Sequence, residues 1–434
     1  MKAFFTFFFI LVLAVGGIAG YAYFKYKPVL SQVAQNPLVE DVLNKAKDAA
    51  KNAATGANDP FMANLGNDPG SQDIAFAVGN SIGQIKNNLG KGIYTVQRDG
   101  KKIFYVTKGW TPSKDSIAGS VTDPVFSPDG QYILFNGHTL NGSYYVVPAK
   151  GGAVNQISPD IGFEPGGGWI SPDQILLWSD RPAGGGVGLT MGAEKHFYVY
   201  SASKNTSREL TGLTTFEKKY TQRILTGNGY FITTGLDTNE HLHIVSHKAD
   251  GSITGDHTYK WIGFQTVGEP AAASPTQLIW LIKKGGSGSI VAKDGFYLLD
   301  AATGALTLIV DETSYLNGIA ATFGPTQQTI FPNPKDGTEY LYTTTVASQG
   351  GAKASMVKLI YRQPSGTIGR FTKDSASGGL SAEVGASWSP DGVTAAFTDS
   401  AALGLGSAIY TATPGSVPQL LVPYGNFPSW NPVR

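Results

Sequence analysis

Beyond about residue 90, short apolar runs alternate with polar turn sequences in a pattern that repeats along the chain. In PVFSPDGQYILFNG at 124–137, one apolar run ends in Ser-Pro-Asp-Gly and a second, alternating run begins at Tyr132. Pro128 fixes φ near about −65°, Asp129 can hydrogen-bond the turn backbone, and Gly130 supplies a positive φ. This order predicts two antiparallel strands joined by a tight turn.

The same pattern occurs six more times. The clearest copy, GASWSPDGVTAAFTD at 385–399, has the equivalent turn residues Pro390, Asp391 and Gly392. Weaker copies place the turn at Pro172, Asn228, Pro275, Pro334 and Pro432, so that the repeat spans 42 to 59 residues. A period of about 40–50 residues with four short strands is typical of β-propeller blades. The sequence therefore predicts an all-β propeller of seven blades, or of six if the copy around Asn228 is not a complete blade.

The last copy, FPSWNPVR, stops after its first strand. Two further strands, at 92–97 and 102–107, precede the first copy and have no other assigned blade. We expect Phe427 and Trp430 to lie on a strand paired with the strand around Ile103–Val106. Closing the ring in this way removes free sheet edges.

The aromatic-Ser-Pro-Asp-Gly turn followed by an apolar strand is clearest at Phe126–Gly130 and Trp388–Gly392. In this feature, residues 92–434 resemble the TolB-type, WD40-like (PD40) propeller repeat. The resemblance implies a propeller fold, commonly in the bacterial envelope and commonly engaged in protein binding, and it implies no reaction. The N-terminal α/β domain of TolB has no counterpart in residues 28–91, which are too few and too helical.

The chain begins with an uncharged run from Ala3 to Phe24, bracketed by lysines. A run of this length can cross a membrane as a helix, whereas the apolar part of a cleaved signal peptide usually spans about 7–15 residues. We therefore predict a transmembrane signal anchor at 1–27, with the rest of the chain outside the cytoplasm, in the periplasm or at the cell surface. Cleavage near Gly17–Ala19 is the alternative.

Residues 28–91 are predicted to form a helical stalk and linker between this anchor and the propeller at 92–434. A first helical stripe is followed by a Gly/Asn/Asp/Pro-rich linker, TGANDPFMANLGNDPGS. A second stripe has apolar residues at helical spacing and ends at Gly90. Its members are Val78, Ile82, Ile85 and Leu89.

The composition excludes several classes of function. Only 15% of residues are charged and the formal net charge is +1, so the protein has no long-range electrostatic attraction for nucleic acid. The absence of cysteine excludes disulfides, thiolate catalysis, zinc fingers and iron–sulfur clusters. We predict no cofactor and no resident metal.

Motifs with catalytic or metal-binding potential have simpler explanations here. His241, His243 and His247 share one face of a predicted strand and could ligate zinc or copper. Strand alternation alone explains them if the residues between pack inward and the histidines are solvated. A Gly-x-Ser-x-Gly match at 79–83 lacks the strand–turn–helix setting of a hydrolase. The seven tryptophans are expected in the core between blades rather than on a sugar-binding surface.

Insertions fall repeatedly between the second and third strands of the predicted blades, at 138–142, 181–195, 283–294, 346–354 and 400–407. In an antiparallel blade these loops leave on the face that also carries the blade-to-blade connections, here called the long-loop face. The face with the Ser-Pro-Asp-Gly turns is called the short-turn face. Binding residues concentrate on loops held by a rigid scaffold, although surface loops also tolerate neutral insertion. The predicted binding residues are His138, Asn141, Arg181, Lys195, Lys283 and Lys284.

These observations leave two hypotheses. The first is a non-catalytic, protein-binding or scaffolding subunit of an envelope complex, whose cationic long-loop face favours an acidic or carbonyl-rich partner surface. The alternative is a carbohydrate-binding protein or carbohydrate-active enzyme that uses the central funnel. Two carboxylates within about 5–10 Å of each other at the funnel mouth would support it. The candidates are Glu164, Glu217, Glu240, Glu269 and Asp399.

Overall fold

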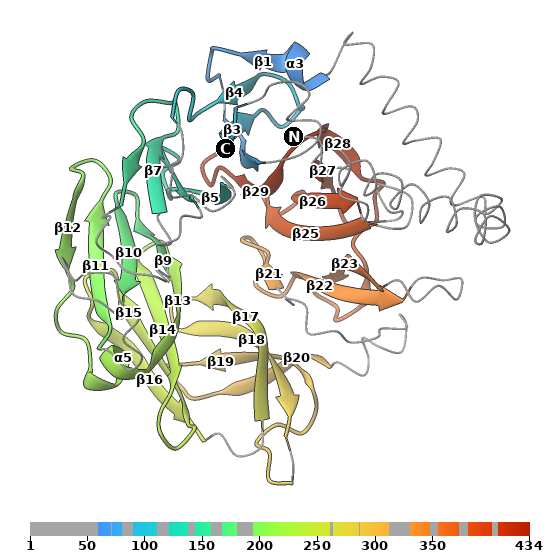
Figure 1. Cartoon of the computed structure of the whole chain (residues 1–434). Helices are drawn as coiled ribbons and strands as arrows, with labels where there is room; N and C mark the ends of the chain where they lie inside the picture. The colour runs from blue at the N-terminus through green and yellow to red at the C-terminus, as the bar shows by residue number, and fades with distance from the viewer. Residues whose placement is uncertain are drawn as a thin grey trace, which may run out of the picture. The chain divides into compact units, whose positions relative to one another are not determined.

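In the computed structural model the described residues are 60–70, 72–79, 90–110, 121–137, 144–157, 167–179, 194–260, 264–285, 287–311, 330–347, 355–372, 381–401 and 407–434. Residues 60–434 form one compact unit. The strands form seven separate sheets arranged around a central axis (Figure 1). The prediction of an all-β, seven-bladed propeller is therefore confirmed.

Blades 2 to 7 are antiparallel four-stranded sheets, each built from consecutive strands. Blade 2 contains β5 (Thr122–Phe126), β6 (Tyr132–Asn136), β7 (Tyr144–Pro148) and β8 (Asn155–Gln156). Blade 3 contains β9 (Gly167–Ser171), β10 (Gln174–Ser179), β11 (His196–Ser201) and β12 (Thr206–Glu209). Blade 4 contains β13 (Thr221–Gly227), β14 (Tyr230–Leu236), β15 (Leu242–Lys248) and β16 (Ile253–Tyr259), and α5 (Thr215–Tyr220) precedes it. Blade 5 contains β17 (Phe264–Ser274), β18 (Gln277–Lys284), β19 (Gly295–Asp300) and β20 (Leu306–Asp311). Blade 6 contains β21 (Ile330–Pro332), β22 (Tyr340–Ala347), β23 (Ser355–Arg362) and β24 (Ile368–Arg370). Blade 7 contains β25 (Ser381–Trp388), β26 (Ala395–Ala401), β27 (Ser407–Ala412) and β28 (Gln419–Val422).

Blade 1 joins the two ends of the described chain. The C-terminal strand β29 (Asn426–Trp430) is followed outward by strands that come from the N-terminal side of the propeller (Figure 1). These are β2 (Ile74–Val78), β3 (Gly92–Val96), β4 (Ile103–Tyr105) and β1 (Leu65–Gly66), of which β1 runs parallel to β4. The C-terminal strand therefore closes the ring.

The partner of the closing strand differs from the prediction. Trp430 lies opposite Ile74 of β2, so β29 does not pair with the strand around Ile103. All five residues of β2 are buried, and Val78 belongs to this strand rather than to a helical stripe. A strand covered on both faces is apolar throughout and lacks the period-2 signal that identified the other strands. The propeller therefore begins before the predicted boundary at residue 92.

The predicted linker also contributes to the core. The short helix α3 (Pro60–Asn64) places Phe61 at 0% exposure among aromatic rings, with centroids 6.3 Å from Phe76, 5.6 Å from Tyr94 and 5.8 Å from Tyr424. Aromatic contacts of this kind add stability beyond the burial of area. The assignment of this segment as a linker was therefore wrong around Phe61.

The remaining N-terminal predictions lie outside the described residues. This applies to the anchor from Ala3 to Phe24, to Ile82, Ile85 and Leu89 of the second stripe, and to most of the Gly-x-Ser-x-Gly match. Within the described part of the chain, neither helix has the length and hydropathy needed to cross a membrane.

The hydrophobic core lies between the blades. Each of seven clusters among the described residues combines side chains from two neighbouring blades, such as Phe76 with Ile409 across blades 1 and 7. Trp169 donates its indole N–H to the carbonyl of Val125 in the preceding blade, at 3.0 Å. Trp388 donates in the same way to Phe331, also at 3.0 Å. The tryptophans described in the strands thus stabilise contacts between blades, as predicted.

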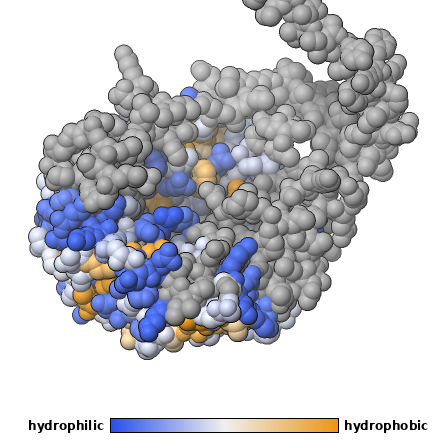
Figure 2. All heavy atoms as spheres, turned by 60° about the horizontal axis from the view of Figure 1, so that its bottom comes forward, coloured by the Kyte–Doolittle hydropathy of each residue, from blue (hydrophilic) through white to orange (hydrophobic). Residues whose placement is uncertain are grey.

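Outside this core, a few large hydrophobic residues, such as Ile253 and Leu308, are exposed among the described residues. Figure 2 shows one side of the molecule, where hydrophobic areas lie beside hydrophilic ones among the described residues. Exposed apolar residues are normal on a protein surface.

The Ser-Pro-Asp-Gly turns have the expected backbone. Gly130 has φ 70° and Gly392 has φ 71°, both in the left-handed region. In addition, a Cβ at Gly130 would collide with the side chain of Asn431, and one at Gly392 with that of Asn333. The turn glycines therefore provide both an unusual φ and room for an asparagine from the preceding blade.

These two contributions can be separated experimentally. Gly392→Ala is expected to lower the free energy of unfolding by about 2–3 kcal/mol, because it adds a collision to the backbone strain. Gly415 has φ 74° and no atom within 4 Å of the position that a Cβ would occupy. Gly415→Ala is therefore expected to lower the free energy of unfolding by only about 1 kcal/mol, through backbone strain alone. Urea unfolding of both variants measures the difference. Equal losses of stability in the two variants would show that the side chain of Asn333 moves aside without an energetic cost.

Candidate functional site

Three of the six predicted binding residues on the long-loop face, His138, Asn141 and Arg181, lie outside the described residues. Lys195 places its ammonium group over the ring of Trp178, 4.6 Å from the centroid. Lys283 and Lys284 end strand β18, where the backbone N–H of Lys284 donates to Asp294 at 2.6 Å. Lys195 belongs to blade 3 and the other two to blade 5, so these three residues do not share a blade.

Helix α5 lies on the long-loop face, because it connects blade 3 to blade 4. Thr214 caps it in a reciprocal capping box: its hydroxyl accepts from the N–H of Glu217, and the Glu217 carboxylate accepts from the N–H of Thr214 at 3.0 Å. The backbone N–H of Lys195 also donates to the carbonyl of Lys218. The helix is therefore held by its own cap and by the end of the 181–195 loop.

A buried ion pair fixes α5 on blade 4. Nε2 of His247 lies 2.6 Å from Oε1 of Glu217, and both side chains have 0% exposure. Nδ1 of His247 lies 3.0 Å from the carbonyl oxygen of Gly251, and Thr233 donates its hydroxyl to the same carboxylate at 3.0 Å. Because both ring nitrogens face oxygen acceptors, an imidazolium satisfies both contacts. Its ring also stacks on Phe231, with 4.4 Å between centroids.

The environment keeps Glu217 ionised. Burial by itself raises the pKa of this carboxyl group, but the contacts with His247 and Thr214 outweigh burial and hold the pKa below its ordinary value. The prediction that the histidines of this strand are simply solvated was therefore wrong at His247. Sequence alternation cannot reveal a partner that lies on a separate helix.

The other two histidines, His241 just before β15 and His243 within it, share a second carboxylate. Oδ2 of Asp237 lies 3.3 Å from Nδ1 of His241 and 3.1 Å from Nε2 of His243. Hydrogen bonds from the backbone N–H of His241 and from neighbouring groups lower the pKa of Asp237 to about 2. The ring of His243 also stacks on Phe216 of α5, with centroids 3.9 Å apart. Among the described residues, no group of three or more histidine, aspartate and glutamate side chains is arranged to hold a metal ion.

The candidate carboxylates for a catalytic funnel have separate environments. Glu217 is paired with His247, and Glu269 on β17 forms a 2.7 Å ion pair with Arg223 on β13. Asp399 is only 3% exposed and lies opposite the equally buried Glu383 in the blade 7 sheet. Glu240 lies in the turn between β14 and β15, and Glu164 lies outside the described residues. Among the described residues, the solvent-accessible members of this set are Glu240 and Glu269.

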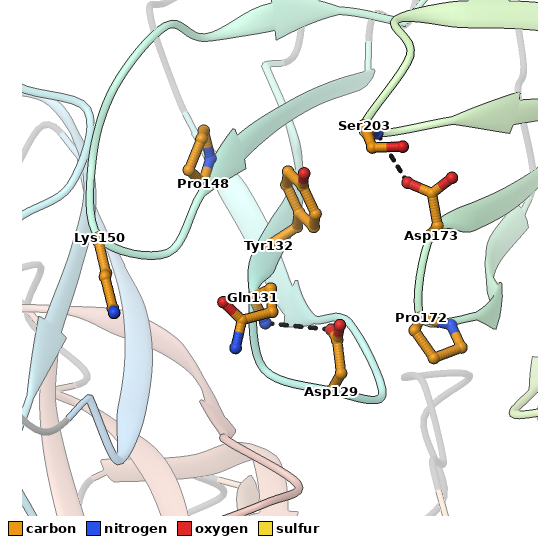
Figure 3. Close-up of a pocket in the computed structure, with 8 residues that line it drawn as sticks. All are labelled: Asp129, Gln131, Tyr132, Pro148, Lys150, Pro172, Asp173 and Ser203. Carbon is orange, nitrogen blue, oxygen red and sulfur yellow. Dashed lines mark hydrogen bonds between the residues drawn. The ribbon is translucent and has the colours of Figure 1, made fainter.

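A groove on the short-turn face was not predicted. It lies between blades 2 and 3 and has a volume of about 510 Å³ (Figure 3). Its lining comes from the first-to-second and third-to-fourth turns of both blades. The residues are Asp129, Gln131, Tyr132, Pro148, Lys150, Pro172, Asp173 and Ser203.

The two aspartates of the groove have different roles. Oδ1 of Asp129 accepts from the Ser127 hydroxyl at 2.6 Å and from the N–H of Gln131 at 3.1 Å, so it stabilises its own turn. Asp173 instead accepts from the Ser201 hydroxyl and the Ser203 N–H, both at 2.7 Å. Burial alone raises the pKa of Asp173, but these hydrogen bonds hold it below the ordinary value. In the sequence, Gln174 stands where the clearest copies of the turn have Gly130 and Gly392, and Gln277 stands at the same position in the copy at Pro275.

No protein-family model and no curated protein matches the chain. Many solved structures share the arrangement. The β-propeller domain of the Trilobed protease from Pyrococcus furiosus is 13% identical, with 77% of this chain and 92% of that chain covered and a TM-score of 0.43. The putative TolB from Agrobacterium tumefaciens is 13% identical, with coverages of 81% and 89% and a TM-score of 0.36. The GH74 enzyme from Niastella koreensis is 12% identical, with coverages of 83% and 52% and a TM-score of 0.48.

These neighbours include enzymes and a TolB protein, and at such identities they assign neither activity nor partner. The class of the protein follows from its own strand topology. The chain contains a seven-bladed β-propeller closed by its C-terminal strand.

Proposed function

We propose that this chain is a membrane-anchored propeller outside the cytoplasm that binds a protein partner in the cell envelope through its long-loop face. The observation that supports this proposal most strongly is that the buried Glu217–His247 pair holds helix α5 rigidly on blade 4. A preorganised surface loses little entropy when a partner docks. The uncharged run from Ala3 to Phe24 supports the anchor, and the resemblance of the repeat to TolB supports the compartment.

The charges on this surface indicate the kind of partner. Lys219 on α5 is exposed, and Lys195 and Lys218 beside it are half-buried. Lys218 lies 3.8 Å from Glu194, a separation that gives weak pairing at an exposed site. This group of lysines favours an acidic or carbonyl-rich partner surface. Binding is favoured over catalysis because Glu217 and Glu269, two of the candidate carboxylates, already neutralise a cation of the same chain.

The test is affinity purification of the tagged full chain from detergent-solubilised membranes, with quantitative mass spectrometry of the proteins that it recovers. Replacing residues 182–192 with Gly-Ser-Gly should leave folding intact, since closure entropy depends only weakly on loop length. Recovery of the partner should fall at least tenfold. The control is Lys335→Glu in an exposed turn of the short-turn face, which should leave recovery unchanged.

Recovery of the chain alone from native membranes would contradict the proposal. A partner that is lost with Lys335→Glu and retained with the shortened loop would place the working face on the opposite side.

A further inference from the structure

The groove between blades 2 and 3 has the chemistry of a second binding site, on the face opposite to the proposed partner surface and independent of it. We propose that it binds an extended peptide segment that carries one basic and one acidic side chain. Asp129 would contact the basic side chain, and Lys150 would contact the acidic one.

At three other blade interfaces of the short-turn face, neighbouring blades contact each other directly through their turns. Asn333 donates to the carbonyl of Gly392 at 2.9 Å across blades 6 and 7, and Arg98 forms a 3.5 Å ion pair with Asp391 across blades 1 and 7. Asn431 packs over Gly130 across blades 1 and 2. Among the described turn residues of blades 2 and 3, no hydrogen bond or ion pair crosses the groove. This interface is therefore open at the surface, whereas those three interfaces are closed.

One wall of the groove is fixed by hydrogen bonds within blade 3. The carboxylate of Asp173 is occupied by Ser201 and Ser203, so it holds the β11–β12 turn against the β9–β10 turn. The opposite wall is fixed by Oδ1 of Asp129, which holds the turn of blade 2. Both walls are thus built before a ligand arrives, which lowers the entropic cost of binding.

Several polar groups on the groove make no hydrogen bond or ion pair with another described residue. These are Oδ2 of Asp129, the side-chain amide of Gln131, the hydroxyl of Tyr132 and the ammonium group of Lys150. Figure 3 shows Lys150 on one side, Asp173 and Ser203 on the other, and Asp129 and Gln131 between them. A ligand that pairs with all four of these groups needs a positively charged group, a negatively charged group, and both hydrogen-bond donors and acceptors.

A peptide meets these requirements better than a sugar does. Its backbone provides donors and acceptors for Gln131 and Tyr132, and its side chains provide both signs of charge. The rings of Pro148 and Pro172 offer apolar walls of the kind that extended peptides pack against. The single aromatic ring, Tyr132, is half-buried and tilts against Trp169 with centroids 6.3 Å apart, so it does not form an open stacking platform.

The test uses the full chain in detergent as the target for a displayed library of random heptapeptides. The library is counter-selected against a double variant, Asp129→Asn with Lys150→Gln. Asparagine keeps the Oδ1 acceptor that the turn needs. The matched controls are Asp391→Asn, in the equivalent turn of blade 7, and Lys335→Gln, in an exposed turn of blade 6.

Enriched peptides should contain both Lys or Arg and Asp or Glu, and fluorescence anisotropy should show binding at least tenfold weaker to the double variant. Both control variants should bind within twofold of the unmodified chain. In addition, replacing the basic residue of the peptide should weaken binding to the unmodified chain and to Lys150→Gln, but not to Asp129→Asn. Three outcomes would overturn the proposal: no enrichment over the double variant, enrichment of uncharged peptides, or binding of an arrayed oligosaccharide that the double variant loses.

Discussion

Deletion of residues 426–434 is expected to abolish the single cooperative unfolding transition of the propeller and to cause aggregation. These residues form β29, which supplies the innermost strand of blade 1 and pairs with Ile74 and Ala75. Without it, β2 becomes an edge strand whose five residues are all apolar and buried in the intact fold. An exposed apolar edge is a template for pairing with other chains. Differential scanning calorimetry and light scattering measure the two effects.

The control for this truncation is removal of Val433 and Arg434 alone, because both are exposed and follow the strand. That shorter deletion should leave the transition nearly unchanged. The peptide NFPSWNPVR, added in trans to the long deletion, should partly restore the transition because it can reoccupy the position of β29. An unaltered transition after the long deletion would mean that the ring is held without its closing strand.

The repeat could be predicted from sequence because its signal is local. Ser-Pro-Asp-Gly specifies a turn through the conformations of its own residues, and the strands on either side alternate visibly. The same left-handed backbone occurs at Asp123, Gly385 and Phe427, each five residues before a turn proline, with φ of 52°, 58° and 54°. The incomplete last copy thus repeats even the bulge of the complete ones.

The closing partner could not be predicted in the same way. The run IAFAV is too short and too uniformly apolar to distinguish a strand from a helix, and Val78 also fits a helical stripe with Ile82. Its pairing with β29 joins residues more than 300 positions apart, for which no local pattern exists. The burial of Phe61 was missed for a related reason, because its glycine- and proline-rich neighbours are typical of a linker.

The candidate sites could also be predicted from the sequence only in part. The capping box of Thr214 and Glu217 is readable in the sequence as Thr-x-x-Glu, but the ion pair with His247 spans 30 positions between two elements. The groove arises between the turns of two blades, and the sequence of neither turn marks it, because the glutamine at 174 recurs at the same position as Gln277 in blade 5. Sites built between repeats are thus visible only after the repeats are placed in space.

Glu217→Gln is expected to lower the free energy of unfolding at pH 7 by about 3–5 kcal/mol, because it removes the buried carboxylate that contacts Nε2 of His247 and accepts hydrogen bonds from Thr214 and Thr233. The new amide also has one NH2 group in place of a carboxylate oxygen. In one orientation this NH2 group faces the backbone N–H of Thr214, and in the other it faces Nε2 of His247. The matched control is Glu209→Gln, which removes the 2.9 Å contact with His196 at a site where Glu209 is 53% exposed. Exposed pairs contribute only about 0–1 kcal/mol, so the control should change little. Urea unfolding of the two variants measures the contrast.

The pH dependence of this loss identifies its cause. The pKa of Glu217 is lowered in the folded state from an ordinary value of 4.5, so the unfolded chain binds the proton more readily. The stabilisation by Glu217 is therefore complete above about pH 5.5 and is lost as the pH falls below 4.5 through the lowered folded-state pKa. The difference between the unmodified chain and Glu217→Gln should narrow over that acidic range, while the small effect of Glu209→Gln stays small. A difference that persists undiminished in acid would assign the loss to packing of the amide rather than to the charge of the pair.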